Sequence, residues 1–118
     1  MPQYLLLIYG DPADAPAPEQ QAAMMPEWFA YTEQLGASGA MVGGNALESA
    51  ETATTVRVRG GETLVSDGPF AETKEILGGY YLIEAADLDA ATAMAAEMPN
   101  IEYGAVEVRP VVVFPQPG

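Results

Sequence analysis

Groups that could take part in chemistry gather in one stretch, Ser66-Asp67-Gly68-Pro69-Phe70-Ala71-Glu72-Thr73-Lys74-Glu75. An aspartate that precedes glycine normally accepts a hydrogen bond from the backbone N–H two residues later. Here that residue is Pro69, which has no N–H. The Asp67 carboxylate therefore caps Phe70 or a later amide, pairs with a cation, or stays available to a ligand. Phe70 either anchors this loop or stacks against a ligand.

Asp67 is the candidate catalytic residue of this stretch. It could transfer a proton alone or together with Glu72, Lys74 or Arg109. An exposed carboxylate is a weak base at neutral pH unless burial changes its proton affinity. The sequence therefore favours ligand binding by Asp67 over catalysis by Asp67 alone. A further interpretation makes the loop purely architectural.

Cationic side chains are scarce: Arg57, Arg59, Lys74 and Arg109 stand against 17 acidic residues. Arg109 shares a strand face with Glu107, since alternate residues of a strand point the same way. It could bind a ligand carboxylate through two parallel hydrogen bonds. The excess of acids favours instead an ion pair of Arg109 with Glu107 or with a facing glutamate.

Aromatic residues could line a pocket in which their hydroxyls serve as polar anchors. Packing in the core or in an interface is the expected role of most of them. They are Tyr4, Trp28, Tyr31, Tyr80, Tyr81 and Tyr103. The candidate ligand-binding set that combines aromatic and charged groups is Trp28, Asp67, Phe70, Lys74, Tyr81 and Arg109.

Residue types that the sequence lacks exclude several functions. It has no histidine and no cysteine, so a Ser-His-Asp triad, a thiolate nucleophile, a disulfide and a structural zinc site are ruled out. The formal net charge of −13 argues against a nucleic-acid partner, because such binding rests on clustered cations. No phosphate-binding glycine loop or EF-hand pattern occurs. We therefore expect no metal and no cofactor.

The sequence shows no targeting or membrane-spanning pattern. The apolar run at residues 4–9 follows no basic region and is too short for the core of a signal peptide. No run approaches the length that crosses a bilayer. We therefore expect a cytoplasmic protein without a membrane partner.

Hydrophobic periodicity and turn residues predict alternating strands and helices. The first helix either starts near Glu19 and contains Pro26, or starts at Pro26; we prefer the longer helix. Asp87 is expected to cap the second helix. The apolar spacing of the first helix places Met25, Phe29, Thr32 and Leu35 on one face. The expected elements are strand 4–9, helix 19–38, strand 40–47, hairpin strands 54–59 and 62–66, strand 80–85, helix 88–98 and strand 105–114.

The order of these elements predicts an α+β fold. Without the hairpin the chain follows the ferredoxin-like order β-α-β-β-α-β, with the hairpin inserted between the second and third strands. Pro110 predicts a final strand at a sheet edge, because proline cannot donate to a ladder of hydrogen bonds. A single domain would span residues 1–114, and residues 115–118 would form a C-terminal tail.

The first strand is apolar on both faces, although helices cover only one face of a ferredoxin-like sheet. Residues 4–8 show this pattern, and residues 80–83 repeat it. A second subunit on the other face would close two sheets into a dimeric α+β barrel. The alternative is that loops and the hairpin of the same chain cover that face. We favour the homodimer.

Several segments resemble a known family. Residues 67–75 resemble the signature segment of the DGPF subgroup of YCII-related proteins. The resemblance continues at residues 4–10, 43–47, 78–81 and 104–110. It implies a ferredoxin-like dimeric α+β barrel, a mostly uncharacterised function and, for some members, a gene beside that of a sigma factor.

The resemblance also shows where this chain departs from its relatives. YCII-like relatives that are better understood resemble dehydrochlorinases and muconolactone isomerases, which use a His-Asp pair in the pocket. This sequence has no histidine, and Trp28 stands near the position in the first helix where that histidine would fall. The His-Asp chemistry is therefore not carried over, and the sequence leaves open whether the protein is an enzyme.

Taken together, these features predict a homodimer whose pocket holds a small organic molecule, an anionic one included. Its chemistry would be metal-free proton transfer of the isomerase or lyase type. The alternative is a non-catalytic binding or regulatory module linked to a sigma factor. Its acidic surface would then bind a basic face of a protein partner in transcription regulation.

Overall fold

The computed structural model describes residues 1–11, 13, 17–69 and 74–115. The strands and helices expected from the sequence are present, with bounds that differ by a few residues. Among the described residues, no helix combines the length and the apolar character needed to cross a membrane. The elements are β1 (Gln3–Gly10), α1 (Pro18–Ala37), β2 (Met41–Ala46), the short 3₁₀ helix η2 (Ala50–Thr52), β3 (Thr54–Arg59), β4 (Glu62–Asp67), β5 (Ile76–Glu84), α2 (Leu88–Ala95) and β6 (Gly104–Pro110).

Four strands form one antiparallel sheet in the order β2-β5-β1-β6. This order and the two helices confirm the α+β class and agree with a ferredoxin-like arrangement. The prediction from Pro110 is also confirmed, because β6 lies at an edge of the sheet. In the described part of the chain, β3 and β4 pair with each other and form a separate two-stranded sheet.

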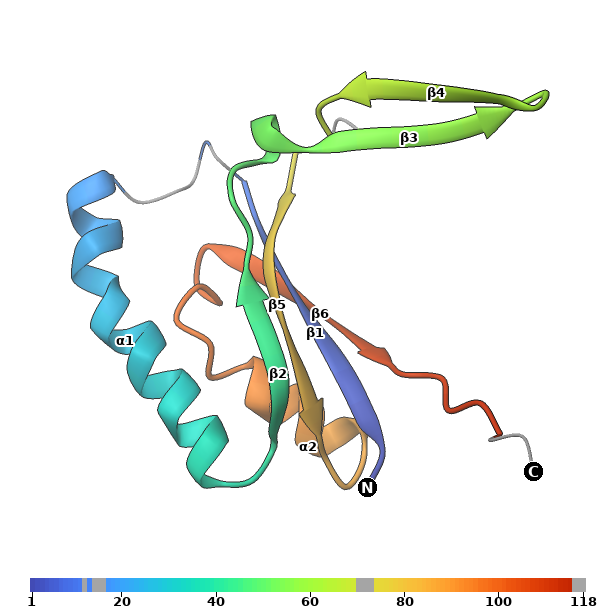
Figure 1. The fold of residues 1–118 in the computed structure, drawn as a ribbon. Helices are drawn as coiled ribbons and strands as arrows, with labels where there is room; N and C mark the ends of the chain where they lie inside the picture. Colours follow the sequence, from blue (N-terminus) through green and yellow to red (C-terminus); the bar gives the residue numbers. More distant parts are fainter. Residues whose placement is uncertain (12, 14–16, 70–73, 116–118) are drawn as a thin grey trace.

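Both helices pack against one face of the four-stranded sheet (Figure 1). Alternate residues of β1 and β5 point toward them, and Leu6 and Ile83 are fully buried there. The Asp87 side chain caps α2 as predicted, by accepting a hydrogen bond from the Ala90 N–H at 2.9 Å. The core between helices and sheet consists of Tyr4, Leu6, Tyr31, Leu35, Ala40, Ile83, Ala85, Ala91, Ala95 and Met98.

Helix α1 is the longer of the two helices that the sequence allowed, and Pro26 lies inside it. Tyr31 and Leu35 are buried against the sheet. In the first half of the helix the shared apolar face is not packed, and Met25 and Phe29 there are 45% and 66% exposed. The physical reason is a cavity that separates this half of α1 from the strands.

The other face of the sheet carries apolar side chains that no helix in the described part of the chain covers. Leu5 lies opposite Leu82, and Leu7 lies opposite Tyr80, on the face that points away from Leu6. All four side chains are half-buried. The predicted pattern of a strand that is apolar on both faces is therefore present in the fold.

The hairpin of β3 and β4 projects from the upper end of the sheet, toward the side opposite α1 (Figure 1). Val56, Val58 and Val65 on it are 60%, 58% and 64% exposed. The radius of gyration is 16.6 Å, whereas a compact chain of this length has about 13 Å. The hairpin therefore stands out from the domain, with its own apolar side chains in solvent.

Candidate functional site

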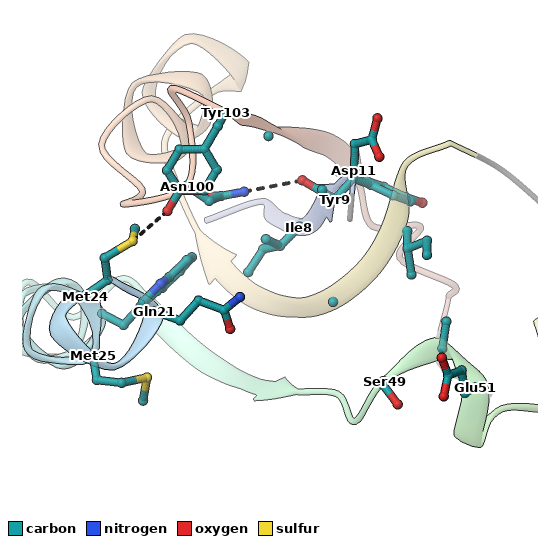
Figure 2. A pocket seen from close by; sticks show the side chains of 16 residues that line it. Ile8, Tyr9, Asp11, Gln21, Met24, Met25, Ser49, Glu51, Asn100 and Tyr103 are labelled. Atoms are coloured by element: carbon teal, nitrogen blue, oxygen red, sulfur yellow. Dashed lines mark hydrogen bonds between the residues drawn. The ribbon is translucent and has the colours of Figure 1, made fainter. Parts of the chain in front are cut away.

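A cavity of about 600 Å³ lies between the N-terminal half of α1 and the upper end of the sheet (Figure 2). A second cavity of about 420 Å³ continues from it along α1 toward β2. Both are lined by Ile8, Met25, Trp28 and Gly78. The walls are mainly apolar, as in pockets that hold small organic ligands. Because the two cavities share these residues, we refer to them together as the channel.

Glycines on the facing strands explain why this region is hollow. A Cβ atom at Gly44 would lie 2.8 Å from the Tyr80 carbonyl oxygen, and one at Gly79 would lie 3.0 Å from the Asn45 carbonyl oxygen. Only glycine allows strands β2 and β5 to approach this closely. Because these positions carry no side chain, the strands leave open the space below α1.

The first cavity ends at a buried carboxylate. Asp11, directly after β1, is 9% exposed. Its Oδ1 accepts a hydrogen bond from the Ala13 N–H at 2.9 Å. Its Oδ2 is buried and accepts no hydrogen bond from the described residues. The ammonium group of Lys74 lies 3.7 Å from Oδ2, on a side chain that is 83% exposed.

A buried amide lies at the same end. Asn100, in the turn before β6, is 8% exposed. Its Nδ2 donates to the Tyr9 carbonyl at 3.4 Å, whereas its Oδ1 is buried without a hydrogen-bond partner in the described part of the chain. Buried polar atoms are rarely left unpaired. Two buried acceptors that lack a hydrogen bond within the described residues therefore mark the polar end of this cavity.

Tyr103 connects the two sides of the first cavity. Its hydroxyl donates to the sulfur of Met24 on α1 at 2.9 Å (Figure 2). Burial, and then the nearby carboxylates of Glu27 and Glu102, raise the pKa of Tyr103 above its ordinary value. The phenol therefore stays protonated at neutral pH and serves as a hydrogen-bond donor.

Aromatic side chains close the second cavity toward the core. The Tyr81 hydroxyl lies 2.6 Å from the Thr32 hydroxyl. The ring of Tyr31 packs edge-on against the rings of Trp28 and Tyr81, with distances of 6.5 Å and 5.6 Å between the ring centroids. These contacts fix the orientation of the Trp28 and Tyr81 rings at the cavity wall.

Two residues of the set predicted from the sequence line these cavities, and a third contacts a lining residue from outside. Trp28 lines both, and Tyr81 lines the second. Lys74 contacts Asp11, which lines the first. Phe70 lies outside the described residues.

Asp67 and Arg109 are not among the described residues that line either cavity. Asp67 ends β4 at the base of the hairpin, where its side chain is exposed. Arg109 lies on the edge strand β6 and forms an ion pair with Glu107 at 3.6 Å. This is the pairing that the excess of acids favoured. Within one chain, the structure therefore does not bring Asp67 and Arg109 into a common site.

The sequence interpretation missed Asp11 and Asn100. Gly10 and Gly104 are paired at the ends of β1 and β6. Asp11 directly follows Gly10, and Asn100 stands four residues before Gly104. A polar residue in the loop next to each of these two strand ends was the available signal. A Cβ atom at Gly104 would lie 2.5 Å from the Tyr9 carbonyl oxygen, so glycine is required there for the close packing that positions Asn100.

Comparison with known proteins places the chain in a family. Residues 2–115 match the YCII-related domain. The chain belongs to the YCII-related family. It is also 37% identical over 119 residues to an uncharacterized protein of Rhizobium meliloti (strain 1021), an alignment that covers 98% of this chain and 95% of the relative. The YCII-related resemblance of the sequence is thus confirmed, whereas membership of the DGPF subgroup stays a prediction.

Proposed function

We propose that this YCII-related protein binds a small organic molecule in the channel between α1 and the sheet. The observation that carries the proposal is the channel itself, with cavities of about 600 and 420 Å³. Cores of folded proteins are close-packed, and a hollow of this size beside a packed core is typical of a ligand pocket.

Tryptophan fluorescence offers a direct test, because the sequence has a single tryptophan and it lines both cavities. We expect titration with a library of small apolar compounds to shift the emission of Trp28 with saturable curves. If no compound shifts the emission, and none raises the melting temperature, the proposal is wrong.

A matched pair of glycine variants locates the binding. Gly78 lines both cavities, and a Cβ atom there meets nothing closer than the Ile8 carbonyl oxygen at 4.0 Å. We expect Gly78→Leu to narrow the channel and to weaken binding by about tenfold or more. Gly36→Leu, on the exposed side of α1, adds the same side chain and is expected to leave binding unchanged.

The reaction class that we propose for the site is proton transfer without a metal. The carboxylates of Asp11 and Glu51 are the candidate proton acceptors, and the Tyr103 hydroxyl, which keeps its proton, could donate a hydrogen bond to the charge that develops on the ligand. Exchange of ligand C–H for C–D in D₂O, followed by NMR, measures this activity. We expect Tyr103→Phe to slow the exchange. Binding without exchange would favour instead the alternative of a non-catalytic module, whose link to a sigma factor stays a prediction.

The protein is further proposed to be a homodimer that covers the open face of the sheet. The support is the half-buried set of Leu5, Leu7, Tyr80 and Leu82 on that face. The hairpin and the segment after β6 project toward the same side (Figure 1). An isolated two-stranded hairpin is marginally stable in water, so contact with a second copy would stabilise it.

Light scattering after size exclusion tests the dimer. We expect the wild type to elute with twice the mass of one chain, and Leu82→Glu to elute as a monomer, because the charge would be buried in the interface. Ala93→Glu, on the exposed side of α2, is the control and should stay dimeric. A wild-type monomer at micromolar concentration contradicts the dimer.

A further inference from the structure

Two buried atoms at the polar end of the channel lack a hydrogen bond within the described residues, and both are of one chemical kind. Asp11 Oδ2 and Asn100 Oδ1 are both acceptors, and both are buried without a hydrogen-bond partner among the described residues. Their residues are 9% and 8% exposed and line the same cavity (Figure 2). A ligand that satisfies both atoms must bring hydrogen-bond donors.

The charge of the channel selects among donors. None of the described residues that line the two cavities is cationic, whereas Asp11 and Glu51 carry carboxylates. The chain as a whole has a formal net charge of −13. A carboxylate ligand would meet repulsion here, and a cation would be attracted. The anionic ligand expected from the sequence rested on Arg109, which lies outside the channel and pairs with Glu107.

An ammonium group of the chain itself, that of Lys74, already lies near the Asp11 carboxylate. This group approaches Asp11 Oδ2 to 3.7 Å from the solvent side, beyond the length of a direct hydrogen bond. Because the lysine side chain is 83% exposed, the pair is of the weak surface kind. A ligand ammonium that enters from the channel could therefore replace it at Oδ2.

The rest of the channel fits the body of such a ligand. Ile8, Met25 and Ile76 offer apolar walls. Trp28 adds a large aromatic ring to these walls. The hydrogen bond from the Ala13 N–H holds the Asp11 carboxylate in one orientation.

We propose that the ligand of the channel is a small apolar amine, whose ammonium group donates a hydrogen bond to the buried Asp11 Oδ2. This inference rests on the proposed function of the channel as a ligand pocket. It names the chemical class that the pocket selects.

Three probes with the same ring and different head groups test the proposal: cyclohexylmethylamine, cyclohexylmethanol and cyclohexanecarboxylate. Binding is measured at neutral pH by calorimetry and by the emission of Trp28. We expect the amine to bind at least about tenfold more tightly than the carboxylate, with the alcohol between them. Equal or tighter binding of the carboxylate overturns the proposal but leaves the channel a ligand pocket. If none of the three probes binds, both proposals fail.

Variants that remove one negative charge test whether Asp11 causes the preference for the amine. We expect Asp11→Asn to weaken binding of the amine by about tenfold and to change binding of the alcohol by less than about threefold. Asp89→Asn removes the same charge from an exposed position in the first turn of α2 and should change neither. If both substitutions weakened binding of the amine equally, the overall negative charge of the protein would explain the preference instead of Asp11. That result would overturn the proposal.

A variant that leaves Asp11 in place guards against misfolding of Asp11→Asn. Lys74→Gln removes the competing ammonium at 3.7 Å, so we expect tighter binding of the amine and unchanged binding of the alcohol. Weaker binding of the amine to Lys74→Gln contradicts the proposal.

Discussion

The two halves of α1 face the same sheet in different ways. In the packed half, residues 30–37, Tyr31 and Leu35 are buried, and the Tyr31 hydroxyl donates to the Met94 carbonyl at 2.7 Å. In the hollow half, residues 18–29, Met25 and Phe29 remain 45% and 66% exposed. The same helix therefore contributes to the core at one end and borders a cavity at the other.

The difference teaches that helix periodicity determines which side of a helix is apolar, but not how closely that side approaches its neighbour. Large side chains of the strands, such as Ile83, meet the packed half in the core. Gly78 and Gly79 face the cavity beside the hollow half and offer no side chain for contact. The composition of the facing strands therefore decides where the channel opens.

Truncation of one apolar side chain in each half should give the largest contrast. We expect Leu35→Ala to lower the free energy of unfolding by about 2–5 kcal/mol, because it leaves a cavity in the core. Met25→Ala should cost less than about 1 kcal/mol, since Met25 already borders open space. Urea unfolding followed by circular dichroism measures both. Equal losses would show that the hollow half is packed in solution.

Two glycine substitutions compare the polar end of the channel with the packed half. A Cβ atom at Gly104 would lie 2.5 Å from the Tyr9 carbonyl oxygen, whereas one at Gly36 meets nothing within 4 Å. Gly104→Ala should therefore cost about 1–3 kcal/mol of unfolding free energy. Gly36→Ala should add up to about 1 kcal/mol, because alanine favours the helix. A neutral Gly104→Ala in the same unfolding assay would contradict the tight packing around Asn100.

Tyr31 should make the packed half sensitive to alkaline pH. Its burial, with smaller contributions from Tyr81 and Glu97, raises the pKa of Tyr31 above its ordinary value. The folded state then holds the phenol proton more tightly than the unfolded state. This contribution to stability is complete below the unfolded pKa of about 10 and is lost as the pH rises through and beyond it.

The variant Tyr31→Phe checks this titration. At neutral pH we expect a loss of about 0.5–1.5 kcal/mol, because the hydrogen bond to the Met94 carbonyl is absent. Above pH 10 the unfolding free energy of the variant should fall less steeply than that of the wild type. Parallel pH profiles would mean that Tyr31 is not the group that titrates.

The strands, both helices and the edge position of β6 were predictable from local patterns. Alternation and turn residues located the hairpin, Asp87 marked the start of α2, and Pro110 marked the edge strand. Each of these features depends on residues close together in the chain. Local sterics and hydrogen bonds therefore suffice to predict them.

The candidate site was predictable only in part. Trp28 and Tyr81 do line the channel, because aromatic residues are common in pockets, and Lys74 only contacts Asp11 from outside. Asp67 was chosen because Pro69 prevents the usual turn hydrogen bond, and Arg109 because cations are scarce in this sequence. Neither property shows where the folded chain places the residue. Residues 70–73, beside Asp67, lie outside the described residues.

The sequence alone determined the kind of protein: an α+β chain of the YCII-related family, strongly acidic, without histidine or cysteine. Only the tertiary structure decided where its reactive groups meet. Asp11 and Asn100 are far apart in the chain, and the pairing of β1 with β6 brings them to one cavity. Burial and the loss of hydrogen-bond partners are properties of that packing, so no local pattern could reveal them.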